Sequence, residues 1–449
     1  MANSINDFSS VAGINVNAFT SLDQTNLSAN SFLPIQPENL EQAQLEPKDL
    51  FPLVLRMLFL HGDQSGFAIS KQLRLPFSSL SNVLASLRTN QLTAHKSSAS
   101  NNDYLYELTP KGAEQARLVL ERSTYCGAAP VSIESYNDSV LRQSIKSCHP
   151  SMESIQRAFK NVVISKLLMA QLGQAINSGK SMLLYGAPGN GKTFLAKHII
   201  DSIDPFVWIP RALSLGGEVM RIFDPSLHTE VPLPANGSFD FRNPIDERWV
   251  RIKRPFMSVG GELTSDHLEA TLNPITRIIE APIHIKSNCG CLAIEDLGRQ
   301  KISVAELLNR WIVPMSEGHD FVNLPTGRQI KLPFDQLLIF TTNLDPATLC
   351  DEAFLRRLPY KIEVFDPTEQ QFRQLFEMRR QQWGFEFQSG IVDYLIEYYY
   401  KRRNKPFRFC HIDDLLNQAI DFCTFHKMPL VFNRDILEIA ALNYFSGGQ

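Results

Sequence analysis

Apolar positions in the first quarter of the chain follow helical spacing and then strand spacing. Phe51, Val54, Leu55, Leu58 and Phe59 recur three and four residues apart, which predicts a helix. The next stretches keep helical spacing and are separated by turn residues, and later stretches alternate apolar and polar residues as strands do. The elements expected here are helices closed by Gly62, over 65–73, over 77–89 and beginning at Thr109, and hairpin strands over 91–96 and 104–109.

A different pattern precedes this region. Residues 1–46 are rich in Ser, Asn, Gln and Asp, with scattered apolar residues and no sustained period. Such a composition buries too little apolar surface to offset the entropy lost on ordering, so we expect a disordered tail. Phe32, Leu33 and Pro34 remain a candidate docking motif for a partner within it.

The order helix, helix, helix, hairpin, helix over residues 50–122 resembles a winged helix-turn-helix domain, and the phrase Tyr-Glu-Leu-Thr-Pro-Lys-Gly at 106–112 is typical of its wing-to-helix junction. The candidate recognition helix, 77–89, carries Arg88 as its one basic residue. Because phosphate neutralisation supplies most non-specific affinity for DNA, this charge pattern favours a protein-docking or regulatory module. DNA binding is the less favoured alternative.

Further along, short apolar runs are each followed by polar residues, as buried parallel strands are. The pattern turns helical again from residue 368. We expect the fold class to be α/β, a parallel sheet flanked by helices with a helical lid, preceded by the α+β winged helix. The expected divisions are a tail at 1–46, the winged helix at 50–122, a connector at 123–150, the nucleotide-binding domain at 151–366 and the lid at 367–445.

The run Ser181–Tyr185 leads into Gly-Ala-Pro-Gly-Asn-Gly-Lys-Thr, which matches GxxxxGK[ST] at every fixed position. Glycines let backbone N–H groups point at phosphate oxygens, Lys192 reaches the β and γ phosphates, and the Thr193 hydroxyl takes Mg²⁺. The chain is therefore expected to bind ATP and Mg²⁺. The predicted nucleotide contacts are Gly186, Pro188, Gly189, Asn190, Gly191, Lys192, Thr193 and Phe194.

A second run, Cys291–Ile294, ends in Glu295 and Asp296 and resembles a Walker B motif with its two carboxylates in reversed order. We expect Glu295 on the metal side and Asp296 as the base that activates water. The reversal puts the hydrolysis rate in doubt, though not nucleotide binding.

A third strand ends at Asn343, and an arginine pair, Arg356 and Arg357, follows the phrase Asp-Glu-Ala-Phe-Leu. In this order the motifs resemble the AAA+ ATPases. The resemblance implies that Asn343 is sensor 1 and that one arginine, with Arg357 slightly favoured, enters the neighbouring subunit's site in a homo-oligomeric ring such as a hexamer. A cation from outside is useful because the transferring phosphoryl group carries negative charge.

The AAA+ lid commonly offers a sensor 2 arginine, and this chain has Asp413 in its place, with Arg408 as the candidate substitute. Before the strand that ends in Glu295 and Asp296, residues 249–257 are expected to form a hairpin strand. Arg251, Lys253 and Arg254 on it are candidates for contacting a partner.

Composition narrows the function without deciding it. Hydrophobic residues at 44%, charged residues at 20% and a net charge of −3 give no overall drive toward nucleic acid or anionic membranes. No stretch is apolar enough to span a bilayer, and no basic residue precedes Lys48, so a cytoplasmic protein with reduced cysteines is expected.

Three functions follow from these expectations. The first is an ATPase ring that remodels or assembles a protein partner of unknown identity. The winged helix together with the AAA+ module resembles bacterial stand-alone AAA+ proteins described as predicted ATPases with chaperone-like activity. The phrases that carry this resemblance are Glu295-Asp-Leu-Gly-Arg-Gln, Leu308-Asn-Arg-Trp-Ile-Val-Pro and Asn343-Leu-Asp-Pro. The second is a DNA-dependent ATPase or transcription regulator that uses the winged helix. The third is a nucleotide-gated scaffold whose hydrolysis is slow.

Overall fold

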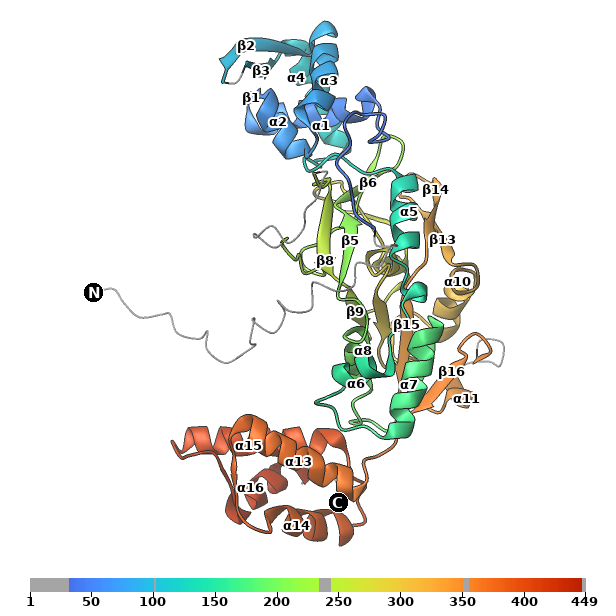
Figure 1. The fold of residues 1–449 in the computed structure, drawn as a ribbon, viewed down its shortest axis with the longest axis vertical. Coiled ribbons are helices and arrows are strands. Elements are labelled where there is room, and N and C mark those ends of the chain that lie inside the picture. The colour runs from blue at the N-terminus through green and yellow to red at the C-terminus, as the bar shows by residue number, and fades with distance from the viewer. Residues whose placement is uncertain (1–31, 101, 234–243, 350–354, 446–449) are drawn as a thin grey trace, which may run out of the picture.

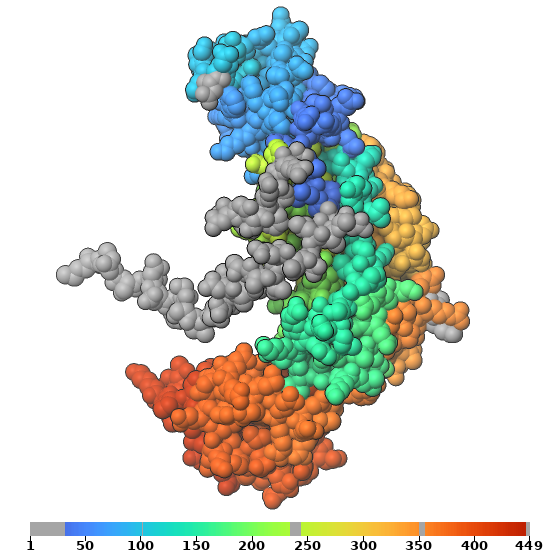
Figure 2. Space-filling view, viewed as in Figure 1, coloured from blue at the N-terminus to red at the C-terminus, as the bar shows by residue number. Residues whose placement is uncertain are grey.

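The computed structural model describes residues 32–100, 102–233, 244–349 and 355–445. An N-terminal helical region, a middle region of small sheets, a parallel-sheet core and a C-terminal helical region follow one another along an elongated molecule (Figure 1). The N-terminal and C-terminal regions form the two tips of a crescent (Figure 2). No helix in the described part of the chain is both long and apolar enough to cross a bilayer.

The N-terminal region packs its helices against a three-stranded sheet of order β1-β3-β2. Its last helix begins where Thr109 Oγ1 accepts a hydrogen bond from Gly112 N at 3.0 Å, with Pro110 in the first turn. A Cβ at Gly112 would lie 1.8 Å from Leu92 O, so only glycine allows this close approach. The elements are α1 (Pro47–His61), β1 (Gln64–Ser65), α2 (Gly66–Leu73), α3 (Phe77–Thr89), β2 (Thr93–Ala99), β3 (Asp103–Leu108) and α4 (Pro110–Arg122).

The prediction of a disordered tail is wrong for residues 32–46. Residues 32–46 lie against the body of the protein, where Ile35 pairs with Ile245 and Ala43 and Leu45 are buried. The Phe32 ring lies 4.9 Å from the ring of Trp249, so the candidate docking motif packs on its own chain. Residues 1–31 lie outside the described part.

The middle region is a set of short strands, most of which the apolar pattern did not predict. A four-stranded sheet of order β10-β11-β7-β6 and the antiparallel pairs β5–β8 and β13–β14 share one core, which includes the fully buried Tyr136. Tyr136 belongs to α5, a packed helix in the stretch expected to be a connector. The elements are α5 (Ile133–Arg142), β5 (Phe206–Pro210), β6 (Ala212–Ser214), β7 (Val219–Arg221), β8 (Trp249–Lys253), β10 (Thr271–Leu272), β11 (Ile279–Glu280), α9 (Ile283–Lys286), β13 (His319–Asn323) and β14 (Gln329–Pro333).

Residues 249–257 are not one hairpin strand. β8 pairs with β5, whereas β9 (Phe256–Val259) joins the parallel sheet, and Arg254 and Pro255 form the break between them. Arg254 is buried and donates to Asp204 O at 2.7 Å, which removes it as a candidate partner contact.

The core is a five-stranded sheet of order β16-β4-β15-β12-β9, and all of its described pairings are parallel. Met182 and Leu184 pack with α7 and α8, whereas Leu183 packs with α10 on the other face, as strand alternation requires. The elements are α6 (Met152–Ala158), α7 (Lys166–Ser178), β4 (Met182–Tyr185), α8 (Lys192–Ile200), β12 (Cys291–Ile294), α10 (Val304–Glu317), β15 (Leu337–Thr342), α11 (Pro346–Leu349) and β16 (Tyr360–Glu363).

The C-terminal region is helical, as its pattern predicted, with one two-stranded parallel pair. Its core is rich in aromatic rings, among them Phe372, Phe376 and Tyr400, which are all fully buried. The elements are α13 (Glu369–Trp383), β17 (Glu386–Phe387), α14 (Ile391–Leu395), the π-helical turn η4 (Ile396–Lys401), α15 (Phe409–Phe425), β18 (Val431–Phe432) and α16 (Arg434–Phe445).

Candidate nucleotide site

The glycine-rich loop lies at the carboxyl end of β4, a strand with neighbours on both sides, and leads directly into α8. Gly186, Gly189 and Gly191 have φ values of 133°, 79° and 77°, a region that other residues rarely adopt. Gly191 caps α8 without a side-chain hydrogen bond, so the N–H groups of the first turn have no side-chain acceptor there. An uncapped helix N-terminus beside such a loop is suited to bind phosphate.

Lys192 is 7% exposed, and its amino group is held over the mouth of the loop. Its Nζ donates to Gly186 O and Ala187 O, both at 2.9 Å, and to Asn343 Oδ1 at 2.6 Å. Within the described residues Lys192 forms no salt bridge, and burial lowers its pKa. The hydrogen bonds of the amino group are therefore made to neutral oxygens, while the nearby Asp296 carboxylate offsets part of the effect of burial on the pKa of Lys192. Thr193 and Phe194, the next two residues, are exposed.

Asn343 connects the lysine to the second carboxylate. Its Nδ2 donates to Asp296 Oδ1 at 2.9 Å, while Asp296 N donates to Thr341 Oγ1 at 3.3 Å. Asp296 has a φ of 49°, which is uncommon for a residue with a side chain. Lys192, Asn343 and Asp296 thus form one hydrogen-bonded row across the ends of β4, β15 and β12.

Glu295 faces the next strand instead. Its carboxylate accepts a hydrogen bond from the hydroxyl of Ser258 on β9, and its backbone N donates to Val259 O at 2.8 Å. The two carboxylates therefore have separate neighbours, Asn343 for Asp296 and Ser258 for Glu295. The motifs do not identify Ser258, although its place beside the end of β12 follows from the parallel register.

The C-terminal region closes over the loop through the start of α15. Arg408, the residue before α15, forms an ion pair with Asp366, and Asn190 Nδ2 donates to the same carboxylate at 2.7 Å. Cys410 N donates to Gly189 O at 3.0 Å. Arg408 is thus beside the phosphate-binding loop, where its charge also contributes to lowering the pKa of Lys192. Asp366 belongs to no sequence motif, so only the structure reveals that it joins Arg408 to Asn190 of the loop.

Three other predicted residues lie outside this cluster. Asp413 pairs with Arg379 of α13 at 2.6 Å, so it serves contacts within the C-terminal region. Arg356 and Arg357 are exposed on the segment between α11 and β16. Within the described residues, no group of three His, Cys, Asp or Glu side chains could hold a metal on its own.

The chain shows limited similarity to known proteins. A family described as Domain of unknown function (DUF8689) matches residues 368–443, and no curated protein sequence matches. Among solved structures, the RuvB Holliday junction branch migration motor of Thermotoga maritima is 15% identical, with a TM-score of 0.33 over 65% of this chain and 69% of that chain. A point mutant of the same RuvB gives 15% and 0.33 over 65% and 70%. At such TM-scores the function has to be argued from this chain's own residues.

Proposed function

We propose that this chain binds ATP and hydrolyses it at the glycine-rich loop. The observation that carries the proposal is the buried Lys192 amino group, which is held over the loop by neutral oxygens and forms no salt bridge within the described residues. Desolvating a cation without an anion is costly, so the arrangement fits a protein that receives its anion as a ligand.

In the proposed reaction Lys192 and the N-terminus of α8 bind the phosphates. Asn343 and Asp296 orient the attacking water, and the Asp296 carboxylate accepts its proton as oxygen bonds to the γ-phosphorus and ADP leaves. Arg408 supplies a further positive charge from the lid side, after exchanging Asp366 for the ligand.

A bound Mg²⁺ would neutralise charge on the β and γ phosphates, and Thr193 and Glu295 are the residues proposed to hold it. The exposed Thr193 hydroxyl and the carboxylate of Glu295 have the oxygen chemistry that Mg²⁺ prefers.

The finer part of the proposal is an AAA+ ring that remodels or assembles a protein partner. Two features support it: Arg357 is exposed, and the exposed face of α3 is made of neutral residues with Arg88 as its one cation. A helix with this face is better suited to contact a protein than to neutralise DNA phosphates.

The test compares Lys192→Ala with Asp296→Asn by calorimetric ATP titration and by phosphate release. We expect Lys192→Ala to abolish binding, and Asp296→Asn to bind normally and lose turnover by at least about a hundredfold, the usual size of a general-base effect. Lys197→Ala is the matched control, because Lys197 is an exposed lysine on the same helix.

Each result would contradict or favour a specific part of the proposal. Normal binding by Lys192→Ala would contradict the site, and normal turnover by Asp296→Asn would contradict the assignment of the base. ATP binding by the unmodified protein without measurable turnover at any concentration would favour the nucleotide-gated scaffold.

A further inference from the structure

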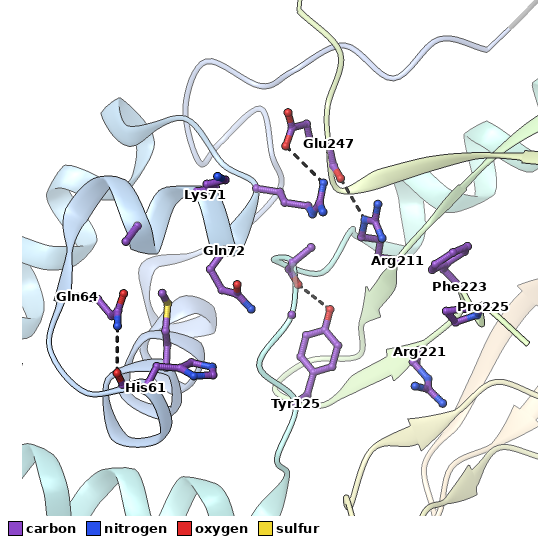
Figure 3. A pocket seen from close by; sticks show the side chains of 15 residues that line it. His61, Gln64, Lys71, Gln72, Tyr125, Arg211, Arg221, Phe223, Pro225 and Glu247 are labelled. Carbon is purple, nitrogen blue, oxygen red and sulfur yellow. Dashed lines mark hydrogen bonds and ion pairs between the residues drawn. The ribbon is translucent and has the colours of Figure 1, made fainter. Parts of the chain in front are cut away.

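A cavity of about 900 Å³ lies where the N-terminal helical region meets the middle sheets. Its walls come from α1 and α2 on one side and from the strands around β7 on the other (Figure 3). This size is typical of pockets for small molecules. None of its lining residues belongs to the glycine-rich loop.

Basic side chains from both regions converge on this cavity. Lys71 and Arg74 come from the end of α2, and Arg211 and Arg221 come from the ends of β6 and β7, with Glu247 as the one acidic residue of the lining. Figure 3 shows Lys71 on the helical side of the opening and Arg211 and Glu247 on the side of the strands.

Three of these cations are incompletely neutralised. Lys71 forms no hydrogen bond or ion pair with any described residue. Arg74 Nη1 lies 3.5 Å from Glu247 Oε2, and Arg211 Nη2 lies 3.4 Å from Glu230 Oε1. Strong charge-assisted hydrogen bonds are about 2.7–2.9 Å long, so both pairs are weak and exchangeable.

Arg221, the fourth of these cations, is neutralised by a close ion pair. It pairs with Glu280 at 2.7 Å, and Glu280 in turn pairs with Lys286 at 3.3 Å, so this group is part of the wall. Burial, and next the neighbouring Arg74, lower the pKa of Arg211, which means that the two guanidinium groups repel each other. The guanidinium of Arg211 is also held 5.4 Å from the centre of the Phe223 ring.

We propose that this cavity binds a small molecule bearing a phosphate group, with Lys71, Arg74 and Arg211 contacting the phosphate. A phosphate offers at least three acceptor oxygens and up to two negative charges, which matches three converging cations better than a single carboxylate does. The rings of Tyr125 and Phe223 in the wall would contact the organic part.

A small ligand fits better than duplex DNA because Arg211, one of the three proposed phosphate contacts, is recessed. The side chain of Arg211 is only 21% exposed, and it lies inside a cavity rather than on a convex surface that a phosphate backbone could follow. Since the walls belong to two regions, the ligand would also hold those regions together.

The experiment is a calorimetric titration of inorganic pyrophosphate, without Mg²⁺, into the full chain carrying Lys192→Ala, so that the glycine-rich loop does not contribute. Adding Lys71→Gln with Arg74→Gln is expected to raise the Kd at least tenfold. The matched control adds Arg157→Gln with Lys160→Gln, which removes the same charge from two exposed residues outside the cavity.

Lys71→Gln alone breaks no hydrogen bond of the described structure and is expected to raise the Kd about threefold, so it remains informative if the double variant does not fold. The proposal is overturned by no measurable pyrophosphate binding, by equal losses in the pocket and control pairs, or by a short DNA duplex that binds through these residues and is not displaced by pyrophosphate. None of these outcomes depends on ATP hydrolysis, so the proposed function can fail or hold separately.

Discussion

Gly189 is a residue at which the phosphate-binding loop directly contacts the C-terminal region, since its carbonyl accepts a hydrogen bond from Cys410 N. A Cβ built there would lie 2.4 Å from Cys410 Sγ but 3.5 Å from Cys410 Cβ, which is ordinary contact. The sulfur atom therefore sets the limit on this position, in addition to the positive φ.

We expect Gly189→Ala to weaken ATP binding at least tenfold, because the loop or α15 has to shift. Combining it with Cys410→Ala should restore part of the affinity. The comparison is Gly390→Ala, which has a similar φ of 74° and nothing within 4 Å of the added Cβ. Calorimetric titration of ATP measures all three, and a double variant no better than Gly189→Ala would mean that backbone strain alone is responsible.

Arg408 gives a second prediction at the residue scale. Arg408→Gln should raise the KM for ATP about tenfold or more, because it removes a cation beside the phosphates. Arg403→Gln on the same C-terminal region is the control, since Arg403 is exposed and lies over the rings of Tyr398 and Tyr399. An unchanged KM for Arg408→Gln would show that Arg408 does not take the place of a sensor 2 arginine.

At the scale of elements, the first turn of α15 contains a histidine that is kept neutral. Burial, and next the neighbouring Arg408, lower the pKa of His411 to about 4, and its Nδ1 lies 2.9 Å from Tyr400 Oη. In the unfolded chain the same group has a pKa of about 6.5, so the unfolded state binds more protons between these values.

The stability that depends on this difference is present above pH of about 6.5 and is lost as the pH falls toward 4. When the pH falls from 7 to 5, we expect the free energy of unfolding to decrease by on the order of 1 kcal/mol more in the unmodified protein than in His411→Gln, after allowance for solvent screening. Urea unfolding at the two pH values measures it, and equal losses would show that His411 does not couple to folding.

The elements that the sequence predicted are those fixed by local chemistry. Glycines and a lysine at set spacing define the loop between β4 and α8, and apolar runs before Glu295 and Asn343 define β12 and β15. The middle sheets escaped prediction because strands such as β6 and β7 have three residues each, too few for a period, and depend on partners far along the chain.

The same limit applies to the site. Lys192, Asn343 and Asp296 were found from motifs, whereas Asp366 and Ser258 act through neighbours that only the folded chain provides. The prediction that Arg254 contacts a partner is wrong. A charged side chain is usually exposed, whereas here backbone carbonyl groups of three segments surround the Arg254 guanidinium.

At the scale of the whole molecule, the proposed trans-acting arginine makes a prediction about assembly. Specific ATPase activity should rise with protein concentration, and Arg357→Ala should abolish hydrolysis without weakening ATP binding. Mixing Arg357→Ala with Asp296→Asn should recover part of the activity, because some sites then combine an intact base with an intact arginine. Phosphate release with light scattering measures both, and activity independent of concentration would contradict a shared site.

Two chain segments connect the N-terminal helical region to the middle sheets. One is residues 32–46, anchored where Ile35 pairs with Ile245, and the other enters the sheets where Val131 N donates to Ala212 O at 2.9 Å. The two regions also share apolar packing, since Ala212, Val219 and Ile278 of the middle region lie in or against the core of the N-terminal region. A molecule bound in the cavity between them would therefore stabilise both regions against unfolding at once.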